Sequence, residues 1–176
     1  MPARRKILKI VLGGDGGVGK TTYMHRYCEG IFIPDTKLTV GVNFFSKSIQ
    51  RGDDVNVSLS IWDLGGQDQF RMLHDQYIIG SRGGLICFAL DRWDSFINIK
   101  NWISMLRGKI PDLPLFLVGM RADLEMEAQK IPLEEIKIAL KEHDLLGYFR
   151  TSSKTGEGVS TAMDALVSHI IENECI

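Results

Sequence analysis

Apolar and polar residues alternate with two different periods along the chain. Over residues 55–61 every second residue is apolar, and this period of two predicts a strand with one buried face. Phe45, Lys47 and Ile49 supply the expected partner strand, joined to it by a turn at residues 51–54. Other segments repeat apolar residues every three or four positions, as one face of a helix does. These helical repeats are Phe96, Ile99, Ile103 and Leu106, and then Val159, Met163, Leu166 and Ile170.

Ile7–Leu12 is a short, mostly apolar run that ends in glycines, and it predicts a further strand. Leu85–Leu90 and Leu115–Val118 are continuous apolar runs bounded by glycine and proline, which are typical of strands buried on both faces of a parallel sheet. Helices are expected from Lys20 to about Cys28 and from Pro132 to about Glu142. Alternating strands and helices predict a three-layer α/β fold that binds ligands at the carboxyl ends of its strands. We expect a single domain over residues 1–176.

The composition is that of a soluble globular protein, with 44% apolar and 24% charged residues. A net charge of −1 leaves no basic footprint, so no nucleic-acid partner is expected. Three widely spaced cysteines predict neither a disulfide framework nor a zinc site, and they favour a reducing, cytoplasmic compartment. No apolar run has the roughly 18 residues of a membrane span. No lipid-attachment signal is visible, so either a tail was removed or the protein works without a membrane anchor.

A glycine-rich segment between the first strand and the first helix carries the clearest chemistry. Its sequence, Gly14-Asp15-Gly16-Gly17-Val18-Gly19-Lys20-Thr21, fits the phosphate-binding pattern G-x-x-x-x-G-K-[ST]. Glycines let such a loop wrap a phosphate with inward backbone N–H groups, and the helix N-terminus adds positive charge. Lys20 is expected to reach the β and γ phosphates and Thr21 to bind Mg²⁺, with Thr22 part of the same site. The alternative, an ordinary glycine-rich turn, is disfavoured by the flanking strand and helix.

A second polar segment, Asp63-Leu64-Gly65-Gly66-Gln67, follows the alternating strand. A carboxylate at this strand end suits a hold on Mg²⁺, and the Gly66 N–H is available to a γ-phosphate. Gln67 carries an amide that can orient a water molecule for in-line attack. Taken alone, the segment is also consistent with a polar turn.

With both segments in place, the chain resembles the Ras superfamily of small GTPases, and most closely its Rab branch, from about Lys6 to Ile171. TVGVNFF at Thr39–Phe45 resembles the segment called switch I, and IWDLGGQDQF at Ile61–Phe70 resembles the DxxGQ motif and switch II. Asp94-Ser95-Phe96, with Asn98 and Trp102, is similar to the family's helix motif SF-x-N-x-x-x-W. The resemblance implies the P-loop NTPase fold of a Ras-like G domain. That fold has a mostly parallel six-stranded sheet, one antiparallel edge strand and about five helices.

The resemblance also implies a role for each of several residues. Thr39 would bind Mg²⁺ and sense the γ-phosphate. The implied metal ligands are Thr21, Thr39 and Asp63, and the implied catalytic residues are Gln67, Lys20 and Thr39. Phe32 would pack across the guanine, or else serve as a core residue at a helix end. Effector proteins would bind a triad for which simple core packing is an equal alternative: Phe44, Trp62 and Tyr77.

The segments that would recognise the base depart from the family pattern. N-K-x-D is expected after the fifth strand, and this chain has Met120-Arg121-Ala122-Asp123. The Asp123 carboxylate can accept two hydrogen bonds from guanine, whereas adenine has no donor pair on that edge. Met120 cannot replace the asparagine amide, which could weaken binding by roughly 1–3 kcal/mol, while the Arg121 stem can still cover the base. Ser152-Ser153-Lys154 resembles the family's S-A-K motif, whose contact comes mostly from the Ser153 backbone.

Three functions stay open on the sequence. The first is a switch that binds GTP or GDP with Mg²⁺ and hydrolyses GTP on the order of 10⁻⁴ s⁻¹ unaided. The chain shows no strong candidate for an arginine finger, the arginine that speeds GTP hydrolysis. GTPase-activating and nucleotide-exchange proteins are therefore expected partners besides effectors. The second is a nucleotide-bound scaffold with negligible hydrolysis, favoured by Met120 and Arg121 but opposed by Gln67, Thr39 and Gly16. The third is a nucleotide kinase or ATPase, which Asp123 opposes.

Overall fold

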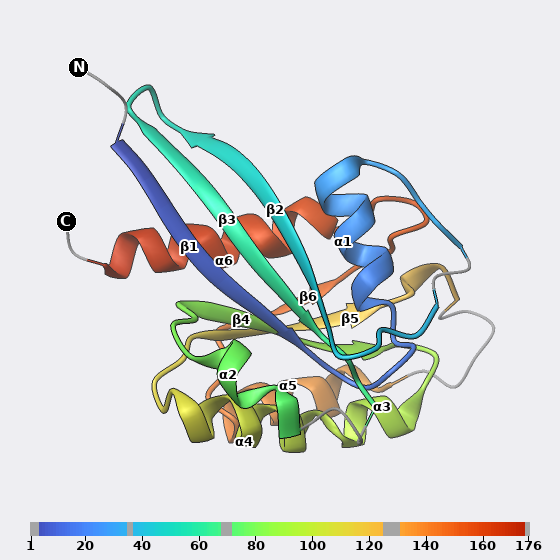
Figure 1. The fold of residues 1–176 in the computed structure, drawn as a ribbon. Helices are drawn as coiled ribbons and strands as arrows, with labels where there is room; N and C mark the ends of the chain where they lie inside the picture. Colours follow the sequence, from blue (N-terminus) through green and yellow to red (C-terminus); the bar gives the residue numbers. More distant parts are fainter. Residues whose placement is uncertain (1–3, 35–36, 68–71, 125–130, 175–176) are drawn as a thin grey trace.

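A single six-stranded sheet forms the centre of the protein. The computed structural model describes residues 4–34, 37–67, 72–124 and 131–174. The strand order is β2-β3-β1-β4-β5-β6, and only the edge strand β2 runs antiparallel to its neighbour (Figure 1). The strands are β1 Arg4–Gly13, β2 Val42–Arg51, β3 Val55–Leu64, β4 Gly83–Ala89, β5 Leu115–Met120 and β6 Tyr148–Arg150. The expected mostly parallel sheet with one antiparallel edge strand is confirmed.

Helices connect the parallel strands. They are α1 Lys20–Glu29, α2 Asp75–Ile78, α3 Trp93–Ile97, α4 Ile99–Lys109, α5 Leu133–Glu142 and α6 Val159–Asn173, with a 3₁₀ turn, η2, at Ala122–Leu124. Because Asn98 alone separates α3 from α4, these two helices form one continuous arm. The described residues therefore contain about five helices, as expected.

The helices cover both faces of the sheet, which produces three layers (Figure 1). Helices α1 and α6 pack on one face, in a cluster that includes Tyr23, Met24 and Met163. The α3–α4 arm and α5 pack on the other face, in a cluster that includes Trp102 and Leu106. Strands β4 and β5 are buried along their whole length because they lie between these clusters.

The sequence patterns correspond to these elements with small shifts at the ends. In β3 Val57, Leu59 and Ile61 are buried, as the period of two predicts, and Val55 at the start of the strand is half-buried. Strand β1 extends the predicted run Ile7–Leu12 by three residues at its start and one at its end. Pro132 precedes α5 as its N-cap, so the helix begins one residue later than expected, at Leu133. Within the described ranges, no helix is both long and apolar enough to cross a membrane.

The five parallel strands end at one edge of the sheet. The loops that follow β1, β3, β4, β5 and β6 therefore meet there, beside the N-terminus of α1 (Figure 1). These loops contain the segments to which the sequence analysis assigned chemistry.

Burial along β1 gives a test of the core. Ile10 is fully buried, whereas Ile7 on the same strand is 70% exposed. We expect Ile10→Ala to lower the free energy of unfolding by about 2–5 kcal/mol, since it removes buried surface and leaves a cavity. Ile7→Ala is the matched control and should change it by about 0.5 kcal/mol or less. Urea unfolding followed by circular dichroism measures both, and equal losses would contradict the assignment of Ile10 to the core.

Candidate functional site

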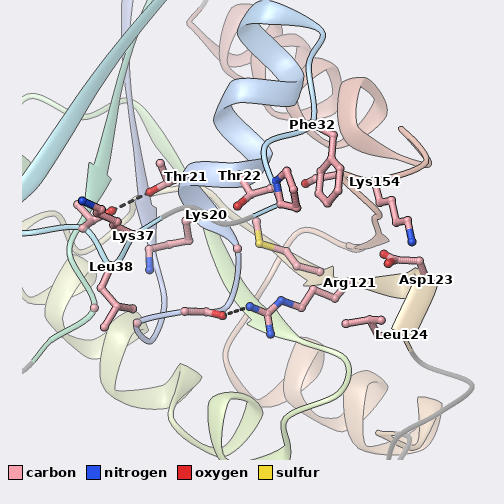
Figure 2. A pocket seen from close by; sticks show the side chains of 18 residues that line it. Lys20, Thr21, Thr22, Phe32, Lys37, Leu38, Arg121, Asp123, Leu124 and Lys154 are labelled. Atoms are coloured by element: carbon pink, nitrogen blue, oxygen red, sulfur yellow. Dashed lines mark hydrogen bonds between the residues drawn. The ribbon is translucent and has the colours of Figure 1, made fainter.

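A cavity of about 300 Å³ opens where these loops meet (Figure 2). Most of the predicted site residues line it: Gly16, Gly17, Gly19, Lys20, Thr21, Thr22, Phe32, Thr39, Gly66, Arg121, Asp123, Ser153 and Lys154. The predicted residues outside the wall are Gly14, Asp15, Val18, Asp63, Gln67 and Ser152. The wall also includes Pro34, Lys37, Leu38, Met120 and Leu124, of which sequence reasoning had considered only Met120.

The phosphate loop, residues 14–21, places a buried cation beside its own backbone. Lys20 is 5% exposed, and its Nζ donates to the carbonyl oxygens of Gly14, at 2.6 Å, and Asp15, at 3.1 Å. Burial lowers the pKa of Lys20, and the nearby charge of Asp63 opposes this effect. Val18 points into the core, so this residue offers a ligand only its backbone.

The Asp15 carboxylate turns away from the cavity. It accepts hydrogen bonds from the Asn98 amide, at 2.7 Å, and from the Trp102 indole, at 2.8 Å. The loop is therefore tied to the α3–α4 arm by a buried, charge-assisted pair of bonds. The sequence identified Asn98 and Trp102 only as parts of a motif, because nothing local links them to Asp15.

Three oxygen-bearing side chains meet at the start of α1. The Thr21 hydroxyl donates to Asp63 Oδ2, and Thr39 Oγ1 lies 2.7 Å from Thr21 Oγ1. Burial raises the pKa of Asp63, while the Lys20 charge and the two hydroxyls act in the opposite direction. Asp63 Oδ1 is buried and has no hydrogen-bond partner among the described residues. Hard oxygen ligands with one unsatisfied carboxylate oxygen fit Mg²⁺.

The backbone of switch II lies directly against the phosphate loop and switch I. A Cβ atom on Gly66 would collide with the Gly16 nitrogen, and one on Gly65 would lie 2.6 Å from the Gly41 carbonyl oxygen. Glycine is therefore required at both positions by close approach. Gln67 follows, and its Cγ would lie 4.0 Å from a Cβ on Gly16. Residues 68–71, which include the end of the predicted switch II, lie outside the described residues.

The other end of the cavity has the features expected of a base pocket. Phe32 is 37% exposed and lines the wall, which disfavours its alternative role as a core residue. Figure 2 shows Phe32, Lys154 and Asp123 around this end. The fully buried Ser152 hydroxyl donates to Asp123 Oδ1 at 2.7 Å, which fixes the orientation of the carboxylate.

Met120 and Arg121 adopt separate roles. Met120 is 2% exposed and belongs to the core cluster under α1, so it contributes apolar surface to the cavity. Arg121 has a positive φ of 63°, and its guanidinium donates to the Gly17 carbonyl (Figure 2). The same guanidinium lies 3.6 Å from Asp91.

The three aromatic residues assigned to effector binding are in contact with one another. The rings of Phe44 and Trp62 are 5.0 Å apart, and those of Trp62 and Tyr77 are 5.4 Å apart. Phe44 is 54% exposed, which excludes simple core packing for this residue. Lys9 lies over the Trp62 ring at 5.0 Å.

Comparison with known proteins agrees with this geometry. The model of the Ras family matches residues 9–172. The chain belongs to the Ras family. Similar proteins include "Ras-related protein Rab-27B" of Homo sapiens, 32% identical over 97% of this chain and 83% of the relative. "Ras-related protein Rab-9A" of Rattus norvegicus is 33% identical over 99% of this chain and 88% of the relative. "Ras-related protein Rab-21" of Dictyostelium discoideum is 35% identical over 98% of this chain and 81% of the relative.

These similarities make the chain a Rab-like small GTPase, a guanine-nucleotide-binding switch. Membership of the family implies effector, GTPase-activating and nucleotide-exchange partners in general. The cavity lies at the carboxyl edge of the sheet, the edge at which open α/β sheets generally bind ligands.

The bond between Ser152 and Asp123 generates a prediction. Ser152→Ala should weaken GDP binding by about tenfold, since Asp123 loses the donor that orients it toward the base. Ser160→Ala on the exposed side of α6 is the control and should leave the Kd for GDP within about twofold. Titration with a fluorescent GDP measures both constants. An unchanged Kd for Ser152→Ala would show that Asp123 does not need this donor.

Proposed function

We propose that this protein is a Mg²⁺-dependent switch that hydrolyses GTP slowly on its own and signals through its two switch segments. The observation that carries the proposal is the cluster of Thr21, Thr39 and Asp63 oxygens beside the phosphate loop. It joins one residue from each of α1, switch I and β3, so a ligand there would link all three. A phosphate-binding scaffold has no need of that link.

The oxygen cluster defines the metal site in this proposal. Thr21 and Thr39 would hold Mg²⁺ directly. Asp63 would support the metal site through the hydrogen bond that it accepts from Thr21. The ion supplies positive charge that neutralises the β and γ phosphates. Thr39 would then hold switch I closed only while a γ-phosphate is present. Release of the phosphate after hydrolysis would therefore open switch I.

The chain's own groups carry out the remaining steps. Lys20, already buried against the loop, would bind the β and γ phosphates, and the Gly66 N–H would donate to the γ-phosphate. Gln67 would orient the attacking water beside Gly16, where the absence of a side chain leaves space. Turnover without a partner is expected on the order of 10⁻⁴ s⁻¹.

Asp123 would select guanine, with Phe32 and the Arg121 stem covering the base and the Ser153–Lys154 segment closing the pocket. Phe44, Trp62 and Tyr77 form the proposed effector surface, because Phe44 is exposed and next to switch I. A cytoplasmic location is part of this proposal.

Hydrolysis is tested directly by replacing the residue that would orient water. Gln67→Leu should slow single-turnover GTP hydrolysis at least tenfold while leaving the Kd for GDP within about threefold. Phosphate release from GTP-loaded protein, with Mg²⁺ and then with EDTA, measures the effect. Hydrolysis no faster than background in the unmodified protein, and unaffected by Gln67→Leu, would favour the alternative of a nucleotide-bound scaffold.

Base selection is tested by competition. GTP should displace fluorescent GDP at far lower concentration than ATP does, because adenine cannot satisfy Asp123. A preference for ATP would contradict the guanine assignment and favour an ATPase.

The contribution of Met120 to base binding is tested by substitution. Met120→Asn should tighten GDP binding by about 1 kcal/mol, or about fivefold, since it adds a polar group at the pocket. Met120→Leu keeps the apolar character and should give none of this gain.

A further inference from the structure

A second arginine reaches the phosphate loop from the loop that follows β4. Arg92 Nη1 donates to the Gly16 carbonyl at 2.9 Å, and Nη2 pairs with Asp94 at 3.2 Å. A Cβ atom on Gly17 would lie 3.4 Å from Arg92 Nη1. The guanidinium therefore lies on the Gly16–Gly17 segment of the loop, although Arg92 is outside the cavity wall.

Arg92 and Arg121 act on consecutive peptide groups. Arg92 holds the Gly16 carbonyl, and Arg121 holds the Gly17 carbonyl. Both contacts are charge-assisted bonds to backbone oxygen, the stronger class of protein hydrogen bond. The middle of the phosphate loop is thus held between two cations that come from the ends of β4 and β5.

The contact between Arg92 and the Gly16 carbonyl also fixes the direction of the Gly17 N–H. All described peptide bonds are trans, so the Gly16 carbonyl and the Gly17 N–H point in opposite directions. Because Arg92 holds that carbonyl away from the cavity, the Gly17 N–H is turned toward the cavity that Gly17 lines. The positive charge also polarises the peptide and strengthens the N–H as a donor.

We propose that Arg92 is a positioning residue for GTP hydrolysis that acts through the Gly16–Gly17 peptide. By holding the Gly16 carbonyl, it aims the Gly17 N–H at the phosphates and strengthens that donor. The inference rests on the proposed function, since it concerns the same reaction. Negative charge that develops on the phosphates during hydrolysis makes a preoriented donor more valuable in the transition state than in bound GDP.

A purely structural role for Arg92 is less consistent with the surrounding contacts. The loop is already anchored to the α3–α4 arm through Asp15, which binds Asn98 and Trp102. Arg92 is one-third exposed and its second partner, Asp94, is largely exposed, so the pair adds little to stability. What Arg92 adds is a positive charge on the Gly16 carbonyl, at a residue whose Cβ would lie 4.0 Å from Gln67 Cγ.

The test compares Arg92→Met, Arg92→Lys and the unmodified full chain, with Arg82→Met as a matched control. Arg82 pairs with Glu174 at the opposite end of β4, far from the cavity. Single-turnover hydrolysis is measured on GTP-loaded protein with Mg²⁺, and the Kd for GDP and the thermal midpoint are measured in parallel. Arg92→Met should slow hydrolysis about tenfold with the Kd for GDP within about threefold, and Arg92→Lys should recover part of the rate. Arg82→Met should hydrolyse GTP at the unmodified rate.

Each other outcome has a definite meaning. A rate for Arg92→Met within twofold of the unmodified protein would overturn the proposal, as would a loss of GDP affinity and stability with no change in rate. If Arg92→Met does not fold, Arg92→Gln, which retains a donor without charge, carries the same expectation. No hydrolysis in the unmodified protein would instead overturn the proposed function, and this inference with it.

Discussion

A loop that binds phosphate through its backbone must turn successive N–H groups inward, and this forces its carbonyl groups outward. In water those carbonyls are solvated, but at the crowded edge of a parallel sheet they need partners from the protein. This chain provides a donor for most of them. Lys20 donates to Gly14 and Asp15, Arg92 to Gly16, Arg121 to Gly17, and the α1 backbone to Gly19.

The same arrangement explains why so many charges are tolerated at one end of the molecule. Lys20 and Asp63 are both buried, and an isolated ion at either position would be costly. Each moderates the shift that burial imposes on the other's pKa, and Thr21 and Thr39 contribute hydroxyl contacts to the carboxylate. A ligand that carries both phosphate charge and a divalent ion would complete this balance, because it offers an anion to Lys20 and a cation to Asp63.

The sequence was sufficient wherever the signal was local. An apolar run identified β1, the period of two identified β3, and helical spacing identified the α3–α4 arm and α6. The glycine-lysine-threonine pattern identified the phosphate loop. Each of these signals depends on neighbours in the chain. The contacts of Asp15 and Arg92 were not predictable, since their partners are 76 to 87 residues away and meet only where strand ends converge. The loop pattern likewise could not show that Val18 serves through its backbone alone.

The two ends of the cavity are held by different forces, and this difference shapes how the switch would work. At the base end Met120 gives an apolar surface, and recognition would rely on Asp123, which accepts a hydrogen bond from the Ser152 hydroxyl. At the phosphate end, cations and backbone donors are concentrated. In the proposed function, binding energy would therefore be weighted toward the phosphates, the part of the ligand that changes on hydrolysis. Because a ligand shifts a conformational equilibrium only through its differential contacts, weighting them toward the phosphate end favours a strong coupling between hydrolysis and the state of the switch segments.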